Sequence, residues 1–247
     1  FARAINYIVV ASALHVYIAQ GIKTLITDLQ VARPTMMIVV PRVLEKVYNA
    51  ASQKAGQGAK GMLFASAVVA SPRFIEEGGE EGKAGRLTTL RHTLYDSLLY
   101  RSIRKVLGGR TEWIVTGGAP LDPELLAFFR GAGVPAYEGY GLTETTAPCA
   151  FNPKGTPFKE GSVGIAFPGF TIRVAKDDEI QVKGPAVFHR YHKNDEATRE
   201  GFTPDGWYAT GDLGKIDNRG FIYITGRKQD LTITAGGTNV PPGPIEA

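Results

Sequence analysis

Short apolar runs alternate with stretches of helical spacing along the first half of the chain. Met36–Val40 is rich in apolar and β-branched residues, which predicts a buried strand, and the following Pro41 is typical of a helix's first position. Two further apolar runs, Trp113–Thr116 and Val134–Glu138, also predict strands, and Asp122 is a suitable N-cap for a helix between them. This alternation predicts an α/β fold with helices packed on a parallel sheet.

The remaining apolar positions of this half predict further elements. We expect helices over Phe1–Ala13, Ile22–Val31, Met62–Ala70 and Leu87–Val106, and a short strand over His15–Ala19. In the last of these helices, the spacing of Leu94, Leu98, Ile103 and Leu107 predicts an inward face.

The pattern changes after about Pro157, where short runs separated by turn residues replace the helical spacing. Strands are expected at Ser162–Ile165, Thr171–Ala175, Glu179–Lys183 and Phe221–Thr225. We therefore predict a parallel-sheet, sandwich-type α/β subdomain over residues 1–157 and an antiparallel, β-barrel-like subdomain over residues 158–225. Residues 226–247 would form a hinge and the start of a further domain.

Composition narrows the class of protein. The net charge of +4 is mildly basic, and no zinc spacing, arginine-rich arm or base-reading motif indicates nucleic-acid binding. A single cysteine, Cys149, excludes an internal disulfide and fits a reducing, cytoplasmic compartment. No apolar run has the length of a membrane span, although the basic balance permits peripheral contact with a membrane. The chain starts at Phe1 rather than Met, so we expect a fragment of a longer protein.

The stretch Tyr137–Thr146, which reads YEGYGLTETT, fits neither a buried strand nor an amphipathic helix. Gly139 and Gly141 would let the backbone approach a ligand closely, and Thr143 and Glu144 offer oxygens of the type that Mg²⁺ prefers. A tight polar turn after a strand explains the same residues without a ligand.

A second glycine-bearing stretch, Gly117–Pro120, follows the expected strand Trp113–Thr116. In open α/β sheets, ligands bind beyond the carboxyl ends of the strands. We therefore expect Gly117–Pro120 and Glu138–Glu144 to face one crevice.

A third stretch, Trp207–Asp212, places a carboxylate directly after a glycine and behind aromatic residues. Such a carboxylate can accept hydrogen bonds from the hydroxyls of a ribose, although an aspartate in a turn is an equally good interpretation. Gly226–Asp230 is expected to be a linker, from which Arg227 could reach a phosphate or a ribose.

Two groups of possible metal ligands are better explained otherwise. The glutamates between Glu76 and Glu81 are interspersed with glycine, which is typical of a solvated surface loop. His189 and His192 have no third ligand at suitable spacing nearby.

The three stretches, in this order and at this separation, resemble the adenylate-forming superfamily of acyl-CoA synthetases, adenylation domains and luciferases. Tyr137–Thr145 is similar to its tyrosine-glycine-x-threonine-glutamate signature, Trp207–Asp212 to its tyrosine-x-threonine-glycine-aspartate signature, and Gly226-Arg227 to its hinge. The resemblance covers essentially the whole chain. Pro34-Thr35 and Val40–Tyr48 resemble the long-chain fatty acid–CoA ligase branch, notably its bacterial enzymes.

The resemblance implies a two-step ligation of a fatty acid, ATP and CoA that proceeds through acyl-AMP and releases AMP and pyrophosphate. Thr143 would contact the α-phosphate, Glu144 would hold Mg²⁺, and Asp212 would bind the ribose with help from Arg227. Gln229 would lie at the hinge, and Gly236 and Gly237 near the CoA passage. The residues that the resemblance assigns to the nucleotide are Gly117, Gly118, Ala119, Pro120, Glu138, Gly139, Tyr140, Gly141, Thr143, Asp212 and Arg227.

The chain also departs from the family pattern. The family's phosphate loop does not occur in it and would precede Phe1, and the lysine of the C-terminal domain would follow Ala247. Gln229 stands where relatives usually carry lysine or aspartate. We therefore expect this chain to be catalytically incomplete.

Three other interpretations stay open at this point. The chain could belong to a fatty acyl-AMP ligase that loads a carrier protein, or to an aryl-CoA ligase, although Val40–Tyr48 disfavours the latter. It could also be a non-catalytic module that binds an adenylate or a partner. Acyl chain length and oligomeric state cannot be deduced from the sequence.

Overall fold

The computed structural model describes residues 7, 9–119, 121–153, 159–230, 232–233 and 239–240. The chain divides into two compact units. The first comprises Phe1–Glu138 and Lys154–Glu160, and the second comprises Gly139–Pro153 and Gly161–Ala247. Each unit is described separately below.

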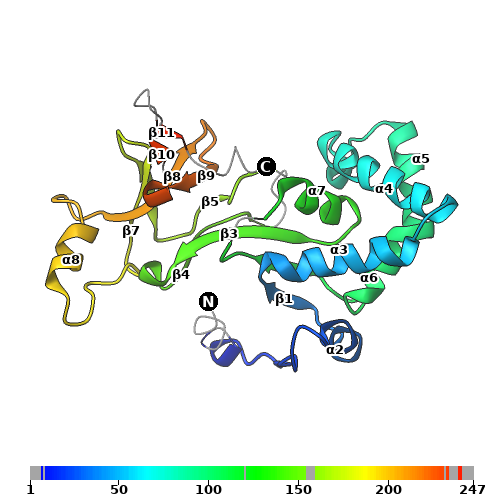
Figure 1. The fold of residues 1–247 in the computed structure, drawn as a ribbon, viewed down its shortest axis with the longest axis horizontal. Coiled ribbons are helices and arrows are strands. Elements are labelled where there is room, and N and C mark those ends of the chain that lie inside the picture. The colour runs from blue at the N-terminus through cyan, green and yellow to red at the C-terminus, as the bar shows by residue number, and fades with distance from the viewer. Residues whose placement is uncertain are drawn as a thin grey trace. The chain divides into compact units, whose positions relative to one another are not determined.

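The first unit combines helices with a parallel sheet (Figure 1). Its elements are α2 (Leu25–Ala32), β1 (Met36–Val39), α3 (Pro41–Ala55), α4 (Ala59–Glu76), η1 (Gly79–Glu81), α5 (Arg86–Tyr95), η2 (Asp96–Tyr100), α6 (Arg101–Val106), β2 (Trp113–Thr116), α7 (Pro123–Gly131) and the start of β3 (Ala136–Leu142). β1 pairs with β2 and β2 pairs with β3, both in parallel. The predicted parallel sheet with packed helices is therefore confirmed.

Local chemistry explains where two of these helices begin. Pro41 opens α3, where its missing N–H and fixed φ are harmless. Asp122 caps α7, and its Oδ1 accepts a hydrogen bond from the N–H of Glu124 at 2.8 Å. Both helix starts were predicted from the sequence.

The core of this unit lies between the helices and the sheet. Leu44, Tyr100 and Phe129 are fully buried there, and α4 packs on α7. Two side-chain bonds fix the polar groups of this layer: the Tyr100 hydroxyl donates to the carbonyl of Ala67, and the Ser71 hydroxyl donates to that of Phe128. Pairing these two buried hydroxyls avoids the cost of leaving them without a hydrogen bond.

Two predictions for this unit are wrong. His15–Ala19 is not a strand, although its apolar run suggested one. Leu94 and Leu98 point to solvent, each 54% exposed, whereas Ile103 and Leu107 of the same predicted face are buried, together with Tyr100. Most of the predicted helix Phe1–Ala13 lies outside the described residues.

The second unit is mainly antiparallel. Its elements are the end of β3, η3 (Thr143–Thr145), β4 (Ala147–Phe151), β5 (Ile165–Ala166), β6 (Thr171–Val174), β7 (Glu179–Lys183), α8 (Asp195–Gly201), β8 (Tyr208–Ile216), β9 (Ile222–Arg227), η4 (Lys228–Asp230), β10 (Thr232–Ile233) and β11 (Asn239–Val240). β6–β9 form a four-stranded sheet in sequential order.

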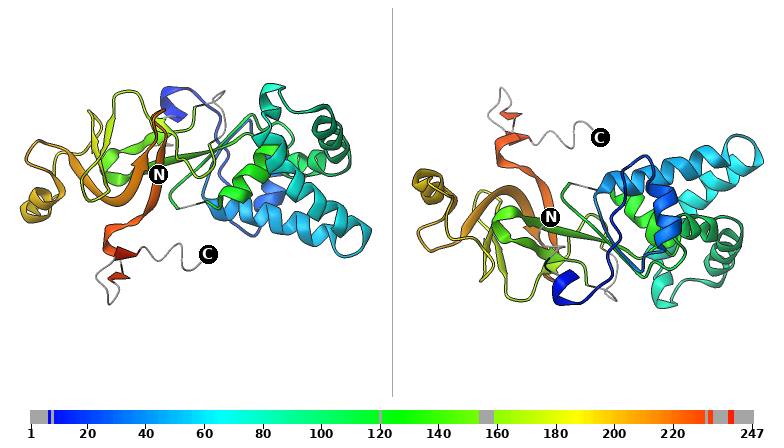
Figure 2. Two further views of the ribbon diagram at one scale, coloured as in Figure 1. Left: turned by 90° about the horizontal axis from the view of Figure 1, so that it is seen from above. Right: turned by 90° about the horizontal axis from the view of Figure 1, so that it is seen from below.

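This sheet is curled, as the bend of β8 shows in Figure 2. Its pairings shift register between Glu179 and Gln181 and between Leu213 and Gly214, and such bulges increase the local twist of a sheet. The predicted antiparallel, barrel-like arrangement is confirmed. Within the described residues, no helix has both the length and the apolar character needed to cross a bilayer.

Candidate functional site

The stretch Tyr137–Thr146 begins as a strand, which its sequence did not indicate, and ends in a turn. Its first six residues continue β3 to Leu142, and Tyr137, Glu138 and Thr145 are buried. The glycines in it have a packing role: a Cβ on Gly141 would lie 2.3 Å from the carbonyl oxygen of Ala147 in the paired strand. The close approach of β4 therefore requires glycine at this position.

Glu138 lies in the first unit, opposite Thr116 in the parallel pairing of β2 and β3. The N–H of Leu121 donates to its Oε1 at 3.4 Å, which brings the end of the loop after β2 to this carboxyl. Burial raises the pKa of Glu138 to about 7, partly offset by the Leu121 N–H.

The loop after β2 presents backbone to solvent. Gly118 and Ala119 are exposed, and Gly118 has a φ of +84°, a conformation that glycine adopts without strain. Gly117 is buried next to the end of β2. Pro120 lies outside the described residues.

In the second unit, η3 places Thr143 at the surface and leaves Glu144 half-buried. The turn is fixed from inside by Thr145, whose hydroxyl oxygen accepts a hydrogen bond from the N–H of Leu142 at 2.9 Å. The hydroxyl of Tyr191 donates to Glu144 Oε1 at 2.9 Å. Among the described residues, Tyr191 is the one donor to this carboxylate.

Asp212 is the centre of the polar contacts on β8. It is 5% exposed, and its Oδ2 accepts a hydrogen bond from the Tyr140 hydroxyl at 2.7 Å. Its Oδ1 lies 3.2 Å from Nε of Arg227, which is its partner in the register of β8 and β9. Burial and the negative charge of Asp212 both raise the pKa of Tyr140, so this hydroxyl stays protonated and acts as a donor.

Two sequence interpretations change here. Trp207–Asp212 is not a turn, because Tyr208 to Ile216 form β8, and Gly226-Arg227 is not a linker, because it ends β9. The structure thus brings together Tyr140, Asp212 and Arg227, which the sequence had assigned to three separate stretches. A carboxylate has about four lone-pair sites, so Asp212 retains capacity for further donors.

The hinge and CoA-side residues are only partly described. Gln229 is exposed in η4. Its neighbour Lys228 bonds Asp177 at 2.7 Å and Glu179 at 3.4 Å, which ties η4 to the sheet. Gly236 and Gly237 lie outside the described residues.

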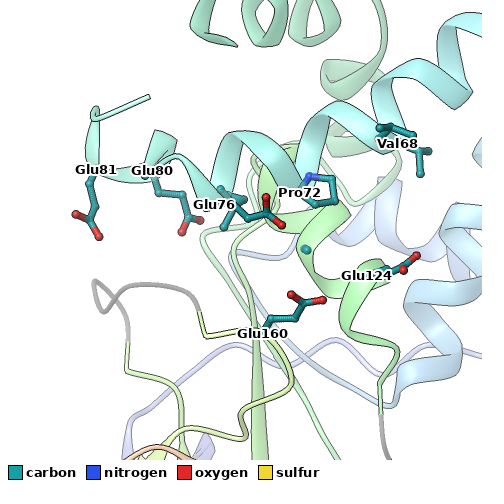
Figure 3. A pocket seen from close by; sticks show the side chains of 11 residues that line it. Val68, Pro72, Glu76, Glu80, Glu81, Glu124 and Glu160 are labelled. Carbon is teal, nitrogen blue, oxygen red and sulfur yellow. The ribbon is translucent and has the colours of Figure 1, made fainter. Parts of the chain in front are cut away.

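The acidic segment after α4 lines a cavity of about 490 Å³ in the first unit (Figure 3). Glu76, Glu80, Glu81, Glu124 and Glu160 surround it, together with apolar residues of α4. The pairing of Glu80 with the guanidinium of the buried Arg130 gives this carboxylate a structural role. Across the described ranges, no group of three or more histidine, cysteine or acidic side chains could hold a metal ion, His189 and His192 included.

Tyr191 is a contributor that the sequence did not indicate, whereas Tyr208 belongs to the third stretch that the sequence singled out. Tyr191 lies between the two histidines that were considered only as metal ligands, and it is 47 residues from Glu144. Its hydroxyl lies 3.3 Å from that of Tyr208. No periodicity or spacing in the sequence could have linked these groups.

Comparison with known proteins identifies the family and the fold that this chain resembles. Residues 2–192 match the family described as AMP-binding enzyme. The long-chain-fatty-acid–CoA ligase FadD15 of Mycobacterium tuberculosis is 44% identical over 245 residues, which are 99% of this chain and 40% of that protein. The long-chain-fatty-acid–CoA ligase 6 of Homo sapiens is 34% identical over 262 residues, covering 100% of this chain and 36% of that protein. The chain thus spans less than half the length of these relatives.

Solved structures of CoA ligases and related enzymes also resemble this chain. ATP-bound MatB from Rhodopseudomonas palustris is 28% identical with a TM-score of 0.60, over 91% of this chain and 36% of that one. The O-succinylbenzoate CoA synthetase MenE from Bacillus subtilis, in complex with AMP, is 23% identical with a TM-score of 0.61, over 92% of this chain and 38% of that one. The likeness to MenE concerns the fold alone.

Proposed function

Because the chain belongs to the AMP-binding enzyme family, we propose that it is the nucleotide-binding part of a long-chain fatty acid–CoA ligase. The observation that carries the proposal is the set formed by Tyr140, Asp212 and Arg227, of which Tyr140 lies within the residues that match the family. The names of the relatives, which are CoA ligases of long-chain fatty acids, favour CoA over a carrier protein as the acceptor.

The proposed reaction has two steps. A carboxylate oxygen of the fatty acid attacks the α-phosphorus of ATP, an O–P bond forms, and the bond to pyrophosphate breaks. The thiolate of CoA then attacks the acyl carbon, a C–S bond forms, and the C–O bond to AMP breaks. Positioning and neutralisation of the phosphate charges supply most of the catalysis in such reactions.

Each candidate residue has a proposed part in binding. Asp212 accepts hydrogen bonds from the ribose hydroxyls, with Arg227 beside it. Tyr140 contacts the adenine, and Thr143 donates to the α-phosphate. We also propose adenine contacts for Gly117, Gly118, Ala119, Pro120, Glu138 and Gly139, a nucleotide contact through the backbone of Gly141, a hinge at Gln229 and a CoA passage at Gly236 and Gly237.

Glu144 is suited to bind Mg²⁺. Mg²⁺ that travels with a nucleotide commonly uses one or two carboxylates in addition to the phosphates. Glu144 supplies one half-buried carboxylate whose Oε1 is oriented by Tyr191. The ion would neutralise charge on the phosphates.

Calorimetry with AMP tests the nucleotide site. Asp212→Asn keeps an oxygen for the Tyr140 hydroxyl but removes the charge, and we expect it to weaken AMP binding about tenfold or more. Asp195→Asn, at an exposed position of α8, is the matched control and should bind AMP normally. If the unmodified chain does not bind AMP, or if both variants bind equally, the proposal is wrong.

Turnover is a separate question. We expect this chain alone to form no acyl-AMP, since it spans only 40% of the length of the related ligase FadD15. Acyl-AMP formation above that of a Glu144→Ala control would contradict this expectation.

We also propose that the first unit contacts an anionic membrane surface. The leucine face, defined as Leu87, Leu90, Leu94 and Leu98, is exposed along one side of α5 and η2, with exposed fractions of 54–68%. Arg86 and Arg91 flank it, and α5 contains no acidic residue. Exposed leucines beside arginines are typical of helices that lie on anionic lipid. A second copy docked on the same face would bring like charges together, which disfavours dimerisation there.

Co-sedimentation with lipid vesicles tests this contact. The chain should bind vesicles that contain phosphatidylglycerol more strongly than vesicles of phosphatidylcholine, and Leu90→Ser/Leu94→Ser should lose this binding. Thr89→Ser/Thr93→Ser on the same helix is the control and should keep it. Equal binding by both double variants, or self-association through the leucine face, would contradict the proposal.

A further inference from the structure

The segment from Ala186 to Tyr191 is attached to the turn that carries Glu144 by three hydrogen bonds. The N–H of Phe188 donates to the carbonyl of Glu144 at 2.8 Å, and the hydroxyl of Thr146 donates to the carbonyl of Ala186 at 2.7 Å. The third bond joins the Tyr191 hydroxyl to Glu144 Oε1 at 2.9 Å. The segment therefore holds both the backbone and the carboxylate of Glu144, and all of these groups belong to the second unit.

Tyr191 is itself fixed on several sides. Its N–H donates to the hydroxyl oxygen of Thr198 at 3.0 Å. Its ring meets that of Phe188 edge-on, with centroids 4.6 Å apart, and Phe188 in turn packs against the rings of Phe202 and Tyr208. A side chain with so few alternative rotamers can orient the group that it binds.

The direction of the hydrogen bonds follows from counting protons. A tyrosine hydroxyl has a single proton, and that of Tyr191 is donated to Glu144. The contact of 3.3 Å between the two hydroxyls is then a bond from Tyr208 to the oxygen of Tyr191. A tyrosine hydroxyl ordinarily keeps its proton until about pH 10, so it is a donor at neutral pH. Tyr208 lies on β8, the strand that also carries Asp212.

We propose that Tyr191 is a positioning residue that fixes the Glu144 carboxylate through Oε1 and leaves Oε2 available to a divalent cation bound with the nucleotide. This inference rests on the proposed function, because it takes Glu144 as the cation ligand. Partners that orient a metal ligand typically change metal affinity by 10–100-fold when they are removed, even though they do not touch the metal.

The first test needs no ligand. Tyr191→Phe keeps the ring and removes the hydroxyl, and its effect on the unfolding equilibrium is measured by urea denaturation with and without Glu144→Ala, which removes the acceptor. We expect the substitution to shift this equilibrium several-fold less when Glu144 is already alanine, since the two side chains interact directly. Tyr223→Phe, elsewhere in the same unit, is the matched control and should be additive with Glu144→Ala. Additivity for Tyr191→Phe as well would overturn the proposal.

The second test measures ATP binding by calorimetry at graded concentrations of Mg²⁺. Tyr191→Phe should raise the Mg²⁺ concentration for half-maximal binding about tenfold and leave the binding of AMP without Mg²⁺ unchanged. Tyr223→Phe should change neither quantity. Nucleotide binding with an unaltered Mg²⁺ dependence in Tyr191→Phe would overturn the positioning role alone. A complete absence of nucleotide binding by the unmodified chain would overturn the proposed function, and the positioning role with it.

Discussion

The buried carboxyl of Glu138 should make the stability of this protein depend on pH. Glu138 lies inside β3 and is 8% exposed. Burial raises its pKa from the ordinary value of 4.5 to about 7, because the ionised form loses its hydration. The Leu121 N–H, which donates to Oε1, offsets part of this effect.

The sign follows from proton binding. Between about pH 4.5 and 7, the folded chain keeps a proton on Glu138 that the unfolded chain has released. The free energy of unfolding must therefore fall as pH rises through this window. The difference between the two pKa values corresponds to about 3 kcal/mol for this group. This contribution is fully present below pH 4.5 and is lost above about pH 7.

Urea denaturation of three proteins at pH 5 and pH 8 measures this contribution. Glu138→Gln keeps the shape of the side chain but cannot ionise, so its stability should fall less between the two pH values, by up to about 3 kcal/mol. Glu45→Gln, at an exposed position of α3, should follow the unmodified chain. If Glu138→Gln and the unmodified chain lose the same stability over this range, Glu138 does not titrate near pH 7 and the reasoning is wrong.

Three further predictions concern stability and are measured by denaturation midpoints. Glu80→Ala removes the partner of a buried guanidinium and should cost about 1–3 kcal/mol, whereas Glu81→Ala, which breaks an exposed pair, should cost less than about 1 kcal/mol. Gly131→Ala places a Cβ 2.3 Å from a neighbouring carbonyl oxygen and should cost about 1–3 kcal/mol, while Gly21→Ala meets no atom within 4 Å and should be nearly neutral. Asp122→Ala removes the cap of α7 and should cost about 1 kcal/mol. Equal effects within either pair, or no effect at the cap, would contradict these assignments.

The elements that the sequence predicted well are those whose signals are local. The strand at Trp113–Thr116 was predicted with the bounds that the structure has, because a short apolar run between turn residues can hardly be anything else. Pro41 and Asp122 marked the starts of their helices because capping depends on residues within one turn.

The first part of Tyr137–Thr146 was not recognised as a strand, for a physical reason. Glycine signals a loop when its role is conformational, but at Gly141 its role is to admit the neighbouring strand, and that strand cannot be identified from the local sequence. Similarly, helical spacing placed Leu94, Leu98, Ile103 and Leu107 on one face but could not say that Leu94 and Leu98 are exposed. Tertiary contacts decided both questions.

The sequence singled out candidate residues of the site but could not give the contacts between them. Asp212 and Arg227 were each singled out, yet their contact depends on the register of β8 and β9, which shifts between Leu213 and Gly214. A bulge of this kind leaves no clear mark in the sequence. The contribution of Tyr191 was missed altogether, because its contact with Glu144 spans 47 residues.

The two partners of Asp212 differ in a way that indicates how a ligand would reach it. Tyr140 is half-buried and close to Oδ2, whereas the Arg227 side chain is 65% exposed next to Oδ1. An ion pair with so exposed a partner contributes at most about 1 kcal/mol, so its rearrangement costs little. Loss of the Tyr140 hydrogen bond would instead deprive a buried charge of a donor. If Asp212 binds ribose as proposed, the hydroxyls should therefore enter on the Oδ1 side while Tyr140 keeps the carboxylate in place. Arg227 directly precedes η4, so a ligand that moves Arg227 would also move the neighbouring Lys228. Lys228 is the residue that holds η4 to the sheet.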